Sequence, residues 1–181
     1  GLAYGHGLFE TIAINQSTPV AWQAHHARLR TDAERLAISL PADIDQLLEQ
    51  DLTELLRLQS VIPDRSVLKI TVTRGCGGRG YAVDDSTSIN RIVQLNSFPQ
   101  YPDEPSLKGV NLRLCDTRLA ISPQLAGIKH LNRLEQVLAR AEWQSSDFRE
   151  GLVLDAEGFL AEGTMSNLFW SNDGVLFTPQ L

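Results

Sequence analysis

Strict alternation of apolar and polar residues marks the clearest strand of this chain. In residues 67–74 the apolar side chains of Leu68, Ile70 and Val72 alternate with polar ones, which is the pattern of a strand with one buried face. Residues 90–97 also read as a strand, and we expect these two segments to pair. Further strands are predicted at residues 8–14, 110–115, 152–155, 159–162, 168–170 and 175–177.

Two turn sequences join the later strands into hairpins. Ala156-Glu-Gly158 separates the strands at 152–155 and 159–162. Asn172-Asp-Gly174 separates the last two strands, and Asp-Gly is a strong signal for a tight hairpin turn.

Three segments instead repeat apolar residues every three or four positions, which is the period of an amphipathic helix. They are residues 23–38, 43–58 and 132–143. Because the helices and strands are segregated along the chain, the sequence predicts an α+β fold. Residues 98–105 contain three prolines and are the predicted linker between residues 1–97, a small N-terminal α+β domain, and residues 106–181, the first part of a larger domain.

Composition narrows the class of protein. The 181 residues are 43% hydrophobic, enough for a sizeable core, and the net charge of −6 without a Lys/Arg run argues against a nucleic-acid partner. No apolar run approaches the roughly 20 residues of a membrane span. The two cysteines, Cys76 and Cys115, suggest neither a disulfide framework nor a metal site. We therefore expect a cytoplasmic protein with no metal, no membrane and no nucleic acid.

The two ends suggest a piece of a longer protein. The chain starts without a methionine, in a glycine-rich turn, and stops just after a predicted hairpin strand. We expect an earlier strand and a later part of the second domain to be missing.

Lys129 is the first candidate for chemistry. It lies between Gly127 and a predicted helix, with the apolar neighbours Ile128 and Leu131. Burial disfavours the charged form of a lysine, lowers its pKa and leaves an amine that can attack a carbonyl. The alternative is an ordinary surface lysine, which is the commoner case. From residue type alone, Glu162 could equally be a solvated acid and Arg28 a solvated helix residue.

A resemblance favours the functional interpretation. Residues 127–136, Gly-Ile-Lys-His-Leu-Asn-Arg-Leu-Glu-Gln, resemble the lysine segment of the class IV aminotransferase family, in the form carried by its 4-amino-4-deoxychorismate lyases. The resemblance extends over essentially the whole chain. Four further segments carry it: Tyr4–Thr11, His25–Leu29, Val72–Tyr81 and Ala161–Phe169.

The resemblance implies a fold, a cofactor and a set of site residues. The fold is the two-part fold of the fold-type IV enzymes, like D-amino-acid aminotransferase, and the cofactor is pyridoxal 5'-phosphate (PLP). Lys129 would be the catalytic residue and form a Schiff base with PLP. Glu162 would keep the pyridine nitrogen protonated, and Arg28 would bind the phosphate. Ser166 and Asn167 would form the turn beside the cofactor, and Ser166 would contact the phosphate through its hydroxyl or its backbone N–H.

The same resemblance assigns substrate contacts. Arg79 and Tyr81 match positions that hold the substrate carboxylate in D-amino-acid aminotransferases. Glu10 and Thr11 are candidates to face the active site, although the sequence does not fix the register of their strand. In the His25–Leu29 motif, the first histidine is expected to be packed or hydrogen-bonded, and His26 to lie on the surface.

The implied activity is a PLP-dependent carbon–oxygen lyase that converts 4-amino-4-deoxychorismate to 4-aminobenzoate and pyruvate in folate biosynthesis, acting as a homodimer. Residues 77–81, Gly-Gly-Arg-Gly-Tyr, and the lysine segment are both lyase-like. The alternatives are a class IV aminotransferase of the D-amino-acid or branched-chain type, with the same lysine, glutamate and arginine, and a non-catalytic fragment of such an enzyme.

Overall fold

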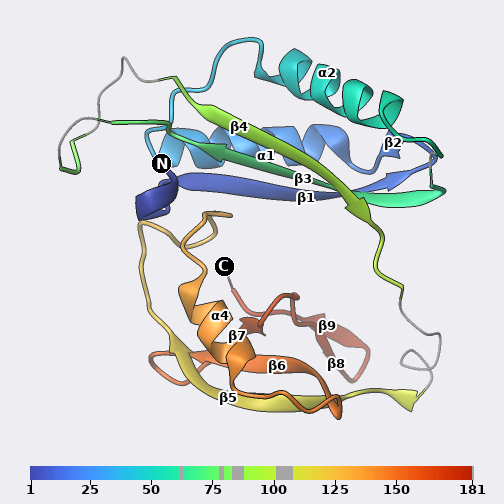
Figure 1. Cartoon of the computed structure of the whole chain (residues 1–181). Coiled ribbons are helices and arrows are strands. Elements are labelled where there is room, and N and C mark those ends of the chain that lie inside the picture. Colours follow the sequence, from blue (N-terminus) through green and yellow to red (C-terminus); the bar gives the residue numbers. More distant parts are fainter. Residues whose placement is uncertain (62, 78–79, 83–87, 101–107, 181) are drawn as a thin grey trace. The chain divides into compact units, whose positions relative to one another are not determined.

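The computed structural model divides the chain into two compact units (Figure 1). It describes residues 1–61, 63–77, 80–82, 88–100 and 108–180. Unit 1 comprises Gly1–Gln100 and Ile128–Asn132, and unit 2 comprises Tyr101–Gly127 and Arg133–Leu181. The chain therefore returns to unit 1 for the five residues around Lys129. Most of the predicted linker lies outside the described residues, and the predicted domain boundaries remain a prediction.

Unit 1 is built on an antiparallel sheet with the strand order β2-β1-β3-β4. Its elements are η1 (Leu2–Tyr4), β1 (Gly7–Asn15), β2 (Thr18–Pro19), α1 (Trp22–Arg35), α2 (Ile44–Arg57), β3 (Arg65–Thr73) and β4 (Asn90–Ser97). The predicted pairing of the two segments at 67–74 and 90–97 is confirmed, with Ile70 opposite Val93.

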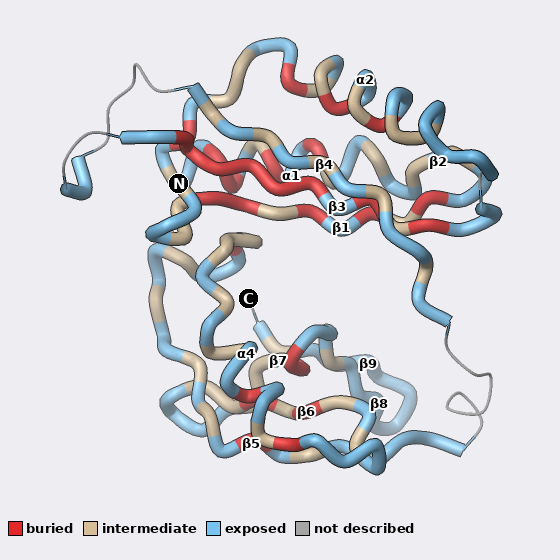
Figure 2. The backbone as a smooth tube through the Cα atoms, in the orientation of Figure 1, coloured by how far each residue is buried: buried red, intermediate tan, exposed pale blue. Residues whose placement is uncertain are grey.

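Helices α1 and α2 cover one face of this sheet and enclose the main core. Leu8, Ile12 and Ile14 of β1 pack in one cluster with Leu29 of α1 and Leu48 of α2. Figure 2 shows these buried stretches along β1, β3 and both helices. Alternate residues of a strand point to opposite faces, so this packing fixes which residues of β1 face the helices.

Helix α1 ends earlier than predicted, at Arg35 rather than at Ile38. Ala37 adopts a left-handed conformation with φ 51°, and the N–H of Ile38 donates to the carbonyl of Ala33 at 2.8 Å. This 6→1 bond closes a helix in the manner of a Schellman motif. Ile38 is nevertheless buried, which explains why it fitted the apolar pattern of the helix.

Unit 2 combines parallel and antiparallel pairing. β5 (Asn111–Leu119) runs parallel to β6 (Phe148–Asp155), with helix α4 (Leu134–Ala141) between them in the sequence. β7 (Leu160–Gly163) pairs antiparallel with β6, which confirms the first predicted hairpin.

The second predicted hairpin is also confirmed. β8 (Trp170–Asn172) and β9 (Val175–Phe177) pair antiparallel. Asp173 and Gly174, between them, both have positive φ, as a type I′ turn requires.

Three segments of unit 2 differ in length from the prediction. β6 starts at Phe148 rather than at residue 152. β5 continues to Leu119 instead of ending at Cys115, because its pairing with β6 is interrupted after Leu114 and resumes at Arg118. Helix α4 starts at Leu134 rather than at residue 132 and ends at Ala141 rather than at 143. In the part of the chain that is described, no helix combines the length and apolar character needed to cross a membrane.

Candidate active site

The backbone of Lys129 is held at the edge of the unit 1 sheet. The N–H of Phe9 donates to the carbonyl of Lys129 at 3.1 Å, and the N–H of Leu131 donates to the carbonyl of Gly7 at 3.0 Å. Leu8 and His130 form the antiparallel bridge between these bonds. The lysine segment thus extends the sheet beside the N-terminal half of β1.

Helix α1 holds the same lysine from a second direction. The backbone N–H of Lys129 donates to Oδ2 of Asp32 at 2.9 Å, and Asp32 is buried. The Nζ atom of Lys129 lies 4.3 Å from the centroid of the Phe9 ring. Lys129 is half-buried, and the preceding Ile128 belongs to the core. These contacts support a fixed, partly desolvated lysine over an ordinary surface one.

Arg28 binds a buried carboxylate one helical turn before Asp32. Its Nε donates to Oε1 of Glu10 at 2.7 Å, and its Nη2 donates to Oε2 of the same residue. His25 completes the cluster, with Nδ1 2.8 Å from Oε2 of Glu10. Hydrogen bonding to Glu10 raises the pKa of Arg28 above its usual value, and the negative charge of Asp32 adds to this effect. The prediction that His25 is a hydrogen-bonded helix residue is confirmed.

The structure settles the register of β1, which the sequence left open. Glu10 lies on the helix-covered face of the sheet and is only 1% exposed, whereas Thr11 is exposed. Arg28 keeps 45% of its side chain exposed. Two of its five N–H groups bind Glu10, and among the described residues no acceptor is bonded to its Nη1. Arg28 can therefore offer an anion the pair of donors on Nη1.

Glu162 of β7 has a partner on helix α4 within unit 2. The Nε2 of Gln136 donates to Oε1 of Glu162 at 2.9 Å. Glu162 is half-buried and lies opposite Val153 of β6. The contact with Gln136 occupies one carboxylate oxygen and leaves Oε2 without a hydrogen bond in the described part of the chain.

The turn that contains Ser166 follows directly. Ser166 and Asn167 are both exposed. The hydroxyl of Ser166 donates to Oε2 of Glu150 at 2.8 Å, so its single proton is already used. Of the two routes predicted for Ser166 to reach a phosphate, the backbone N–H is therefore the one left available as a donor.

The predicted contacts to the substrate are only partly described. Tyr81 is 85% exposed, and its ring lies edge-on to that of Tyr4, with 5.1 Å between the centroids. Arg79 lies outside the described residues. The assignment of both residues to a substrate carboxylate remains a prediction.

The expectation that His26 lies on the surface is wrong. His26 is 4% exposed, its Nδ1 is 2.9 Å from Oδ1 of Asp45, and its ring lies 4.0 Å from that of Trp22. The spacing offered a signal, because His26 precedes Leu29 by three residues and Ala33 by seven, on the same buried stripe of the helix.

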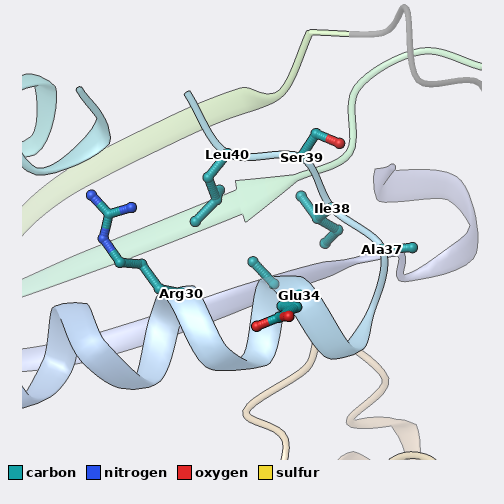
Figure 3. A pocket seen from close by; sticks show the side chains of 7 residues that line it. Arg30, Glu34, Ala37, Ile38, Ser39 and Leu40 are labelled. Atoms are coloured by element: carbon teal, nitrogen blue, oxygen red, sulfur yellow. The ribbon is translucent and has the colours of Figure 1, made fainter. Parts of the chain in front are cut away.

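An open hollow at the end of α1 is not part of this site. It measures about 350 Å³ and is lined by Arg30, Glu34 and the segment from Ala37 to Leu40 (Figure 3). It contains none of the predicted site residues, and Arg30 already pairs with Asp45 at 2.8 Å.

Three polar side chains, two in unit 1 and one in unit 2, each suit one chemical group of PLP. A half-buried amine on Lys129 suits an aldehyde, the donors on Arg28 Nη1 suit a phosphate, and the unbonded oxygen of Glu162 suits a protonated pyridine nitrogen. Three residues hold these groups in place: Glu10, Asp32 and Gln136. The sequence offered Glu10 only as a candidate without a fixed register, and it did not signal Asp32 or Gln136.

Comparisons with known proteins agree with this chemistry. The aminodeoxychorismate lyase of Vibrio harveyi is 38% identical over 178 residues, which cover 98% of this chain and 64% of that protein. The crystal structure of 4-amino-4-deoxychorismate lyase from Pseudomonas aeruginosa is similar at 47% identity with a TM-score of 0.89, over 100% of this chain and 64% of that one. The chain thus spans less than two thirds of the length of either relative.

Aminotransferases share the fold. The crystal structure of Escherichia coli branched-chain amino acid aminotransferase is similar at 26% identity with a TM-score of 0.80, over 98% of this chain and 60% of that one. These similarities confirm the predicted α+β fold of the fold-type IV enzymes. The family profile described as Amino-transferase class IV matches residues 7–181, and the chain therefore belongs to the class IV aminotransferase family.

Proposed function

We propose that the full-length protein is a PLP-dependent lyase that converts 4-amino-4-deoxychorismate to 4-aminobenzoate and pyruvate, a step of folate biosynthesis. The observation that carries the proposal is the 47% identity over 100% of this chain to a protein described as that lyase. The contacts of Lys129, Arg28 and Glu162 support PLP as the cofactor. A cytoplasmic homodimer is part of the same proposal.

Bound PLP supplies an electron sink for the pair of electrons left when the substrate loses a proton. Glu162 would hold the proton on the ring nitrogen through its Oε2, while Gln136 keeps the carboxylate in place from Oε1. Arg28 would bind the phosphate through Nη1, with its guanidinium fixed by Glu10. These residues bind and orient the cofactor.

Lys129 would move the proton. Its Nζ would take the proton from the substrate carbon that carries nitrogen, and the bond between the neighbouring carbon and the enolpyruvyl oxygen would break. The same Nζ would then return the proton to the methylene carbon of the leaving pyruvate enolate. Aromatisation of the ring drives the reaction. Tyr81, with Arg79, would hold a substrate carboxylate so that the breaking bond is aligned.

An aminotransferase is the second candidate, because the E. coli branched-chain enzyme shares the fold over 98% of this chain. An aminotransferase consumes a keto-acid acceptor, whereas the lyase needs none. We expect the full-length protein, loaded with PLP, to release pyruvate and 4-aminobenzoate without an acceptor, as measured by a coupled pyruvate assay and product fluorescence. Turnover that required 2-oxoglutarate and converted it to an amino acid would establish the aminotransferase instead.

Titration of the protein with PLP tests the third alternative, a non-catalytic fragment. A visible absorbance band that borohydride reduction removes is expected for a protein that binds PLP covalently. A chain that folded but developed no such band would favour the fragment.

A further inference from the structure

A tight turn joins Glu162 to the segment predicted to lie beside the cofactor. The N–H of Gly163 donates to the carbonyl of Ser166 at 2.8 Å, which closes the turn, and the N–H of Thr164 donates to the carbonyl of Gly151 on β6 at 3.0 Å. A side chain on Gly163 would force the turn to shift, because a Cβ atom there would lie 2.4 Å from Oγ of Ser166 and 3.1 Å from its carbonyl oxygen.

One carboxylate from the neighbouring strand binds most of the donors of this turn. Oε1 of Glu150 accepts the N–H of Thr164 at 3.1 Å and also its hydroxyl. Oε2 accepts the hydroxyl of Ser166 at 2.8 Å and the N–H of Met165 at 3.4 Å. Oε1 also accepts the N–H of Gly151 at 2.8 Å. Glu150 is half-buried on β6, whereas the turn follows β7 (Figure 1).

The bonds to Glu150 can hold the turn from Gly163 to Ser166 in one conformation. Bonds from N–H and O–H groups to an ionised carboxylate are stronger than bonds between neutral groups. Although burial alone would raise the pKa of Glu150, the bond from the Thr164 hydroxyl and the others lower it below the usual value, so the carboxylate is ionised at neutral pH. The sheet alone cannot replace these contacts, because the N–H of Met165 has no other acceptor among the described residues.

We propose that Glu150 is a positioning residue for cofactor binding: it holds the turn from Gly163 to Ser166, and thereby sets the positions of Glu162 before it and Asn167 after it. Glu150 itself touches neither substrate nor cofactor in this proposal. The inference rests on the proposed function for its link to PLP, but the contacts of the turn can be measured without the cofactor.

The experiment compares Glu150→Gln with Glu157→Gln in the full-length protein. Glu157 is an exposed glutamate in the hairpin turn of the same unit, and its side chain has no hydrogen bond within the described residues. Without PLP, we expect the amide of Met165 to exchange its hydrogen about tenfold faster in Glu150→Gln, the change expected when one bond to a charged group is lost. The amides of the β6 strand should keep their protection, and Glu157→Gln should behave like the unchanged protein.

Equilibrium dialysis then measures PLP binding in the same proteins. We expect Glu150→Gln to bind PLP at least about tenfold more weakly, and Glu157→Gln to bind it normally. Failure of the unchanged protein to bind PLP would contradict the proposed function but not the role of Glu150 in the turn. Normal PLP affinity of Glu150→Gln, or normal exchange at Met165, would overturn the inference.

Thr164 provides a second pair of variants, in case Glu150→Gln unfolds. Valine has the shape of threonine but lacks the hydroxyl that binds Glu150, whereas serine keeps it. We expect Thr164→Val to weaken PLP binding and Thr164→Ser to restore it. Equal PLP affinities of the two variants would show that the contact with Glu150 does not position the turn, and would overturn the inference.

Discussion

Arg28 and Glu10 form a bidentate ion pair, in which the carboxylate is almost fully buried and the guanidinium is half exposed. Helix α1 supplies the arginine and strand β1 the glutamate, so the pair joins the helix to the sheet. The pair fixes the orientation of the guanidinium, because two parallel hydrogen bonds keep its plane aligned with the carboxylate. Whatever anion Arg28 binds must approach from its remaining edge, at Nη1.

The first prediction separates the two roles of Arg28. Arg28→Ala should lower PLP affinity by roughly ten- to a hundredfold, the worth of one strong bond to a charged group. It should also destabilise the fold, because Glu10 loses its main countercharge in a buried position. Adding Glu10→Gln should recover part of the stability but none of the PLP affinity.

PLP titration and urea unfolding measure these two effects. Arg57→Ala is the control, because Arg57 makes a similar bidentate ion pair with Glu54 on the exposed surface of α2. It should change neither quantity much, since surface pairs contribute little. Unchanged PLP affinity in Arg28→Ala would return Arg28 to the role of a structural helix residue.

The second prediction concerns the lysine that binds PLP. Lys129→Ala should abolish turnover and the adduct that borohydride traps, because it removes the amine of the lysine whose backbone is bonded by Asp32 and β1. Lys69 is a matched control: its Nζ also faces the Phe9 ring, at 5.8 Å from the centroid. Lys69→Ala should keep the adduct. Mass spectrometry that located the adduct on Lys69 or Lys108 would contradict the assignment.

The third prediction concerns Glu162 and its partner. Glu162→Gln keeps the shape but cannot hold the pyridine nitrogen protonated, so we expect PLP to bind while turnover falls by roughly two orders of magnitude or more. Gln136→Leu removes the bond to Oε1 and should lower turnover by about tenfold, because the carboxylate keeps its charge and loses only its orientation. Steady-state rates at saturating PLP measure both effects, with the exposed Gln50→Leu on α2 as the control. Near-normal turnover of Glu162→Gln would contradict the electron-sink role.

The sequence predicted strand β4 and helix α2 closely, but it misplaced the end of α1, the end of β5 and the start of β6. Strand β4 matches its predicted range because alternation and turn residues are local signals. The end of α1 was missed because Ala37 adopts a left-handed conformation that usually marks a glycine. Ile38 then folds back into the core. An apolar residue just beyond a helix looks the same in the sequence as one inside it.

Only part of the candidate site could be predicted from the sequence. The residues expected to touch PLP were found through the resemblance of their motifs. The residues that hold them were not, because their contacts span long distances along the chain: Asp32 and Lys129 are 97 positions apart. Glu10 could be seen as a candidate, but its role required the register of β1. No local pattern distinguishes Glu150 from an ordinary strand glutamate.

Glu142 follows α4 directly, binds four donors of β5 and anchors that helix to the strand. Its Oε1 accepts the N–H and the hydroxyl of Thr117, at 2.8 and 2.7 Å, and its Oε2 accepts the N–H of Asp116 at 2.8 Å. Arg113 approaches Oε2 at 3.3 Å. Burial alone would raise the pKa of Glu142, but these bonds outweigh it and lower the pKa to about 2.

The last prediction follows from that shift. A carboxyl whose pKa is lower in the folded than in the unfolded chain stabilises the fold above its unfolded pKa, near 4.5, and loses this effect as the pH falls toward 2. At neutral pH the ionised carboxylate of Glu142 therefore stabilises the fold. Glu142→Gln should therefore lower the free energy of unfolding at pH 7, and the difference from the unchanged protein should shrink between pH 4.5 and pH 2. Urea unfolding at a series of pH values measures this, with the exposed Glu157→Gln as the control. A loss of stability in Glu142→Gln that stayed constant down to pH 2 would mean that packing or a neutral hydrogen bond, and not the ionised carboxylate, holds α4 to β5.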